Sequence, residues 1–166
     1  MINIEQKIKS KIDKNYQYLK QFDLSILSAI ESSVINHARV KTIEAVTLFN
    51  WALLHLDHQP ASGERETHVL VGDYLLSEFY QLITEDNQLS VLSDMMDISK
   101  QIHIDKSRFV TSGRVLCVET LARILYAPIL YLIEKGFIAS HIKDVIDRVV
   151  EDMMDNRQNL LLKEVF

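Results

Sequence analysis

The polar residues best suited to chemistry flank the clearest break in the helical pattern, which contains Pro60, Ser62 and Gly63. Six side chains here could bind a metal ion, a phosphate or a proton: His55, Asp57, His58, Arg65, His68 and Asp73. If the two flanking helices form an antiparallel pair, their connected ends meet and His55, Asp57, His58 and Arg65 lie close together. Asp73 would lie about 12 Å further along its helix than Arg65, at about 1.5 Å per residue.

These residue types allow two interpretations. Two histidines and two aspartates (His55, Asp57, His58 and Asp73) could hold a divalent ion that hydrolyses a phosphate ester. This metal-dependent phosphohydrolase is the alternative function. The order Asp57-His58 reverses the His-Asp pair of all-helical phosphohydrolases, and no second ligand set follows. The pattern favours a polar loop whose histidines cap helix ends or face water.

Two acidic pairs have a spacing that also occurs in metal motifs. Asp94 and Asp97 lie three residues apart, as do Asp152 and Asp155, so each pair occupies neighbouring positions on a helix. The apolar residues of the last helix define its buried face, and Asp155 points away from that face. Both pairs are therefore predicted to be solvated.

The single cysteine, Cys117, has no partner for an internal disulfide. It stands in an apolar run, so we predict that it is buried in the core, and no activating base is near it in sequence. One unpaired cysteine and a polar, charged N-terminus are typical of a cytoplasmic protein.

Composition predicts a single all-α domain spanning residues 1–166. Apolar residues make up 48% of the chain, whereas 4 glycines and 2 prolines leave few sharp turns. Apolar residues recur at helical spacing, and we expect seven to eight helices. The segments with this spacing are residues 4–19, 22–35, 40–56, 66–83, 89–104, 109–135 and 138–166, with a bend near Pro128 and a C-terminal cap at Gly136.

The sequence argues against nucleic-acid binding and against a transmembrane segment. The chain has 18 Lys and Arg against 23 Asp and Glu, and its one basic run, residues 7–14, is diluted by apolar residues. Nucleic acid is therefore not an expected partner. The most apolar window, residues 115–133, is interrupted by Glu119, Arg123 and Pro128. It is predicted to be a buried helix and not a transmembrane segment.

Residues 65–82 carry a resemblance to a known family. Arg65, Val69-Leu70 and Gly72-Asp73-Tyr74 match the pattern Arg-x-x-x-Val-Leu-x-Gly-Asp-Tyr. This pattern resembles the signature of component I, the small subunit of bacterial two-component hepta- or hexaprenyl diphosphate synthases. In that family a helix ending in an acidic, histidine-containing loop precedes the signature, and residues 53–58 stand in that place. A weaker likeness runs through residues 109–126, so the resemblance covers about half of the chain.

The resemblance implies a fold and a function. The fold would be a reduced form of the helical core of trans-isoprenoid synthases. The chain would be inactive alone, would bind no cofactor and would support a catalytic large subunit, component II. That partner would bind Mg²⁺ through two aspartate-rich motifs and act on farnesyl and isopentenyl diphosphate. The small subunit would help to set product chain length for the menaquinone side chain.

The residues agree with a non-catalytic role. Ionising an allylic diphosphate requires several carboxylates that converge on Mg²⁺. At the first expected site the chain offers only Asp57, with Arg65 as the best-placed cation for a diphosphate contact. In this hypothesis the partner interface or tunnel end is formed by Gly72, Asp73, Tyr74, Phe79 and Tyr80. The apolar excess of their helix, and of residues 116–133, would be covered by the partner, whereas the alternative is that both are central core helices of a monomer.

Overall fold

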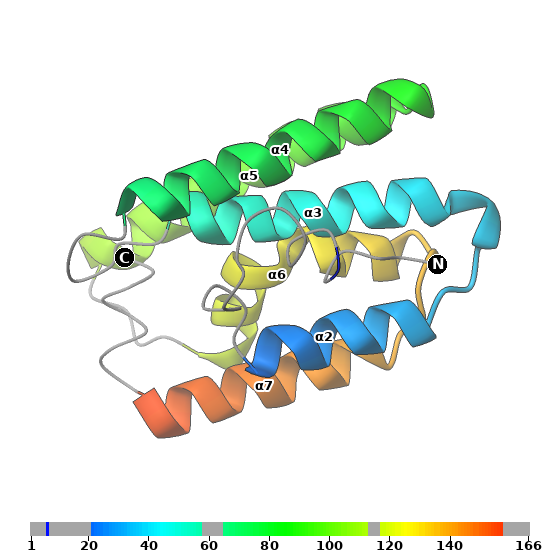
Figure 1. The fold of residues 1–166 in the computed structure, drawn as a ribbon. Helices are drawn as coiled ribbons and strands as arrows, with labels where there is room; N and C mark the ends of the chain where they lie inside the picture. The colour runs from blue at the N-terminus through cyan, green and yellow to red at the C-terminus, as the bar shows by residue number, and fades with distance from the viewer. Residues whose placement is uncertain (1–5, 7–20, 58–64, 113–116, 158–166) are drawn as a thin grey trace.

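The computed structural model describes residue 6 and residues 21–57, 65–112 and 117–157, which contain six α-helices and no β-strand. The helices lie in three pairs (Figure 1). The middle pair, α3 (Val40–Leu56) and α6 (Val118–Glu134), lies between α4 (Arg65–Glu85) and α5 (Leu89–Ser112) on one side and α2 (Gln21–Ser32) and α7 (Ile142–Arg157) on the other. The all-α prediction is confirmed for this part of the chain, and the predicted helix over residues 4–19 lies outside it.

The centre of the fold is α3, whose bounds agree with the predicted residues 40–56. Nearly every side chain of α3 is at least half buried, because α4, α5 and α6 all contact it. Phe49 packs on Phe79 of α4, with ring centroids 4.7 Å apart, and Trp51 packs on Tyr126 of α6 at 6.3 Å. Such tilted aromatic pairs add stabilisation beyond the burial of their area.

The prediction for residues 105–135 is wrong in part. Residues 105–108 were expected to separate two helices, but they lie within α5, which continues to Ser112 before α6 begins at Val118. Two ion pairs explain why so polar a stretch is helical and packs on the rest of the chain. Asp105 pairs with Arg123 of α6 at 3.4 Å, and Lys106 pairs with Asp57 at 2.6 Å. Periodicity in apolar residues cannot reveal contacts of this kind.

The predicted bend in α6 is confirmed. Tyr126 has non-helical backbone angles (φ −133°, ψ 22°), two residues before Pro128. Proline has no N–H and disturbs the helical hydrogen bonds of the preceding turn. Asn50 of α3 compensates, because its Nδ2 donates a hydrogen bond to the buried carbonyl of Leu125 at 3.0 Å. A buried polar side chain of one helix thus stabilises the bend in another.

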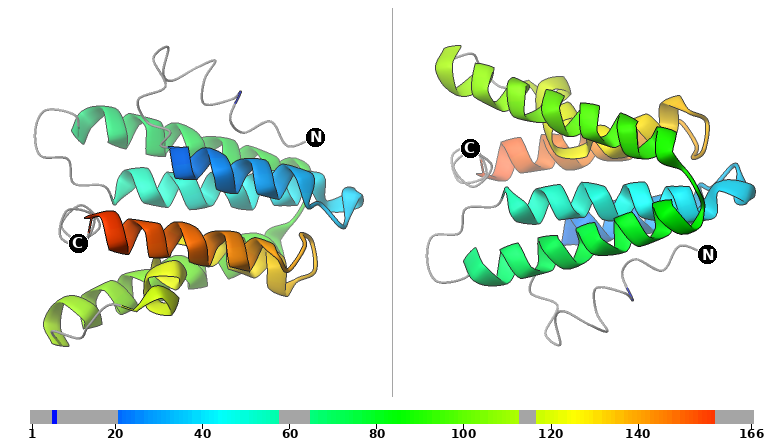
Figure 2. Two further views of the ribbon diagram at one scale, coloured as in Figure 1. Left: turned by 90° about the horizontal axis from the view of Figure 1, so that it is seen from below. Right: turned by 90° about the horizontal axis from the view of Figure 1, so that it is seen from above.

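The predicted cap at Gly136 is also confirmed. Gly136 has φ +71°, its N–H donates to the Ile133 carbonyl, and the N–H of Phe137 donates to the Leu132 carbonyl. This is the Schellman pattern that ends many helices. The chain then passes Ile138, which forms an isolated antiparallel bridge with Val34, and enters α7 beside α2 (Figure 2).

The apolar window at residues 115–133 lies mostly inside the fold. Eight residues of α6 are buried, among them Leu121, Ile129 and Leu132. Within the described residues, no helix combines the length and apolar character needed to cross a membrane. For α6 the surplus of apolar surface is therefore absorbed by the chain's own core, and a partner is not required to cover it.

Candidate functional site

Two buried histidines meet where α3 ends and α4 begins. His55 and His68 are 5% and 8% exposed, and their Nδ1 atoms lie 3.0 Å apart. Their rings are stacked, with centroids 5.3 Å apart. The antiparallel pairing of the two helices, expected from the sequence, brings these side chains together, so His68 belongs to the site more closely than the sequence indicated.

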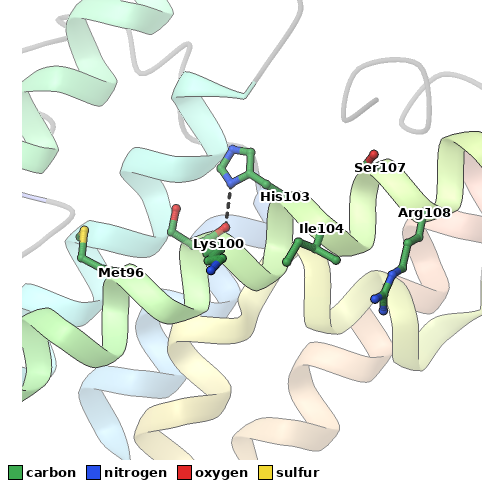
Figure 3. A pocket seen from close by; sticks show the side chains of 7 residues that line it. Met96, Lys100, His103, Ile104, Ser107 and Arg108 are labelled. Atoms are coloured by element: carbon green, nitrogen blue, oxygen red, sulfur yellow. Dashed lines mark hydrogen bonds between the residues drawn. The ribbon is translucent and has the colours of Figure 1, made fainter.

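Asp57 follows the last residue of α3 and faces α5, not α4. Its Oδ2 accepts a hydrogen bond from Lys106 Nζ at 2.6 Å, and its Oδ1 lies 3.7 Å from His103 Nε2. His103 is oriented by its Nδ1, which donates to the Ser99 carbonyl at 2.7 Å (Figure 3). Asp57 is therefore one member of an ion pair that fastens the end of α3 to α5.

The predicted metal cluster is not assembled within the described residues. Asp57 pairs with Lys106, Asp73 is exposed on α4, and His58 lies outside the described residues. No group of three or more potential metal ligands is found among the residues that the structure describes. Arg65 is exposed as the first residue of α4, and no ion pair joins it to Asp57 among the described residues.

Gly72 lies at a close approach between α4 and α3. A Cβ atom at this position would lie 2.6 Å from Leu56 Cγ, 2.8 Å from Leu56 Cδ2 and 3.3 Å from the Ala52 carbonyl oxygen. Those distances leave no space for a side chain. Gly72 therefore allows close packing between two helices of this chain, and its predicted contact with a partner stays a prediction.

The remaining signature residues divide between two faces of α4. The sequence predicted Phe79 at a partner interface or tunnel end, and the structure instead places its ring in the core, 0% exposed. Tyr74 is half buried at the margin of the core, whereas Asp73 and Tyr80 are exposed. The helical period explains the division. Phe79 lies about one turn after Leu75 and about two turns after Val71, and both of these residues are also buried.

The two acidic pairs are mostly solvated, as predicted. Asp97, Asp152 and Asp155 are exposed. Asp94 has a specific partner, since the hydroxyl of Tyr131 donates to its Oδ2 at 2.7 Å and joins α5 to α6. Burial, followed by the hydrogen bond to Asp94 and its charge, raises the pKa of Tyr131 above its usual value.

This bond predicts a specific pH dependence. Because the pKa of Tyr131 is raised in the folded chain, its contribution to stability is complete below the ordinary tyrosine pKa of about 10. It is lost as the pH rises through the higher folded value. Tyr131→Phe should therefore be less stable than the wild type near neutral pH, and the difference should shrink at about pH 11. Urea unfolding at both pH values measures it, and a constant difference would contradict it.

The prediction that Cys117 is buried is wrong. Cys117 is exposed and occupies the position before the first turn of α6, with extended backbone angles (φ −103°, ψ 162°). The apolar run that suggested burial belongs to the helix that follows. Its Sγ lies 3.0 Å from the Thr120 hydroxyl, and hydrogen bonds from the side chain and backbone of Thr120 lower the pKa of the thiol.

A shallow pocket of about 570 Å³ lies on the outer face of α5 (Figure 3). Seven residues line it: Met96, Ser99, Lys100, His103, Ile104, Ser107 and Arg108. All of them come from α5, so the pocket is the outer face of one helix and not an enclosed site. It contains none of the residues that the sequence singled out.

Sequence reasoning missed Lys106 and His103 as partners of Asp57. The available signal was the polar stretch at residues 105–108, but it was assigned to a connection between helices. Had α5 been extended through it, Lys106 would have fallen on the face of α5 that carries Ile102 and Phe109, both turned toward the protein.

Comparisons with protein-family models, with curated proteins and with solved structures find no match to this chain. The resemblance to component I therefore rests on the sequence alone, that is, on residues 53–58, on the signature in residues 65–82 and, more weakly, on residues 109–126.

Proposed function

We propose that this chain is the small, non-catalytic subunit of a two-component trans-polyprenyl diphosphate synthase. In this role it supports a catalytic large subunit and helps to set the length of a product that supplies the menaquinone side chain. The observation that carries the proposal is the two-sided character of α4. The signature residues form one helix, which is tied into the core on one face and presents apolar side chains on the other.

The core face of α4 fixes the helix in place. Val71, Gly72, Leu75 and Phe79 are all buried against the rest of the chain. The outer face leaves large apolar side chains in contact with water: Leu70 is 68% exposed, Tyr80 42% and Val69 37%. Exposed apolar side chains grouped on a rigid helix are typical of a surface that another protein covers.

The spacing on the outer face suits a helix of the partner. Val69, Asp73, Leu76 and Tyr80 follow one another at intervals of four, three and four residues, which places them along one side of α4. Leu76 is half buried and continues the strip between the core and the exposed residues. Asp73 supplies one charge within the strip, which would fix the register of the two helices through a cation on the partner.

In this proposal the effect on chain length is steric. Tyr74 and Tyr80 would stand at the far end of the partner's product tunnel, where bulk stops elongation. Phe79 would act indirectly by supporting the ring of Tyr80, because the two ring centroids lie 5.3 Å apart. Arg65 would be the residue available to a diphosphate, whereas Asp57 is committed to Lys106.

Reconstitution tests the proposal. The purified chain is mixed with a candidate large subunit that carries two aspartate-rich motifs, together with farnesyl diphosphate, isopentenyl diphosphate and Mg²⁺. Prenyl transfer is expected from the mixture at a rate above that of the large subunit alone. Activity of this chain by itself, or an unchanged rate on mixing, would overturn the proposal.

A further inference from the structure

We propose that the pocket on the outer face of α5 binds the phosphate or diphosphate group of a small, soluble phosphorylated molecule. Its volume of about 570 Å³ lies within the range of small-molecule sites. Lys100 and Arg108 are the two cations that would hold the anion, and Ser107 adds a hydroxyl beside Arg108. The site is independent of the subunit function proposed above.

The lining of the pocket is rich in hydrogen-bond donors. None of its seven residues carries a carboxylate, although the chain has 23 Asp and Glu against 18 Lys and Arg. A local excess of positive charge on an acidic chain attracts anions. Five of the seven side chains carry N–H or O–H groups: Ser99, Lys100, His103, Ser107 and Arg108.

Lys100 and Arg108 lie about two turns apart on the same helix. Eight residues separate them, which is about 12 Å at about 1.5 Å per residue, and Ile104 stands between them (Figure 3). A phosphate group lying over Ile104 would be approached by a cation from each side. The planar guanidinium of Arg108 would bind two phosphate oxygens, while the ammonium of Lys100 would offset the charge. A guanidinium has five N–H donors, so contacts of Arg108 within the chain leave donors for a ligand.

The carboxylates near the pocket have other partners. Asp57 pairs with Lys106 at 2.6 Å, and Asp105 pairs with Arg123 at 3.4 Å. In the part of the chain that the structure describes, no ion pair joins Lys100 to a carboxylate. The ammonium of Lys100 therefore keeps its charge available to a ligand.

His103 and Asp97 limit the site. The Nδ1 atom of His103 donates to the Ser99 carbonyl, and its Nε2 faces Asp57 at 3.7 Å, so the ring forms a wall of the pocket and does not hold the anion. Asp97 is exposed on α5 but does not line the pocket. Its negative charge and the shallow shape weaken binding, and we expect a dissociation constant near about 1 mM.

A soluble ligand fits this pocket better than a membrane surface does. A helix that lies on a lipid bilayer presents a broad apolar face with cations at its margins. Here Met96 and Ile104 are the two apolar side chains among seven, and they lie between donors. They would contact the carbon part of the ligand.

Titration with inorganic pyrophosphate at neutral pH and constant ionic strength, followed by NMR, tests the proposal. One pyrophosphate should bind per chain, and the signals that shift should be those of residues 96–108. Lys100→Gln and Arg108→Gln should each weaken binding at least about fivefold, whereas Lys100→Arg should retain it. The matched control is Lys143→Gln, an exposed lysine on α7, which should bind like the wild type.

Four outcomes would overturn the proposal: no saturable binding, shifts confined to other residues, equal weakening by Lys143→Gln, or binding to phosphatidylglycerol vesicles without binding to pyrophosphate. The third would show diffuse attraction between charges, and the fourth would show a membrane-binding surface. The titration needs no large subunit, so its failure would leave the proposed subunit function untouched.

Discussion

Replacing Gly72 with leucine is expected to lower the free energy of unfolding by about 3 kcal/mol, at the upper end of the range for overpacking a core. The first added atom would already lie 2.6 Å from Leu56 Cγ and 3.3 Å from the Ala52 carbonyl oxygen. Backbone cannot move as a side chain can, so α4 would have to shift away from α3. Urea unfolding measures the change through the fluorescence of Trp51, the single and fully buried tryptophan.

A matched control separates crowding from the effect of a leucine on a helix. Ser77→Leu places the same side chain on α4 at an exposed position, and its effect should stay within about 0.5 kcal/mol. If Gly72→Leu unfolded at the same urea concentration as the wild type, the close contact between α3 and α4 would be contradicted. The antiparallel packing of α3 against α4, the helix that carries the signature, would then need another geometry.

Replacing two neighbouring aromatic residues of α4 should lower stability by very different amounts. Phe79→Ala should cost about 3–5 kcal/mol of stability, because it opens a cavity beside Phe49 in the core. Tyr80→Ala should cost less than about 1 kcal/mol, because the side chain is 42% exposed and loses mainly its contact with Phe79. Thermal and urea unfolding of both variants gives the comparison.

The same pair of variants separates stability from partner binding. In the proposed complex, Tyr80→Ala should alter the product length made with the large subunit while the chain stays folded. Phe79→Ala should reduce complex formation only in proportion to the fraction of chain that unfolds. Equal stability losses for the two variants would contradict the two-faced arrangement of α4.

The sequence could predict the helices because each has its own local signals. The bounds of α3, the bend before Pro128 and the cap at Gly136 follow from apolar spacing, from proline's missing N–H and from glycine's freedom at positive φ. The extension of α5 through residues 105–108 could not be predicted in this way. It depends on ion pairs with Asp57 and Arg123, which are distant in sequence.

The candidate site was predicted only in outline. Antiparallel pairing of α3 and α4 brings their connected ends together, but it does not say which way each side chain points. His55 and His68 turn inward toward each other, whereas Asp57 turns to Lys106 and Asp73 turns outward. Cys117 shows the same limit, because its exposure depends on the residue at which α6 begins.

The outer face of α4 is the centre of the proposed function, and a charge placed on it gives the most direct test. Leu70→Glu puts a carboxylate at the most exposed large apolar residue of α4, where it should leave the fold intact. Leu89→Glu is the control, since Leu89 is similarly exposed (65% against 68%) but belongs to α5. The measurement is the rate of isopentenyl diphosphate incorporation by the large subunit as each chain is titrated into it. The account predicts activation by the wild type and by Leu89→Glu, and an apparent affinity at least about tenfold weaker for Leu70→Glu. Equal activation by all three chains, or activation by none, would contradict it.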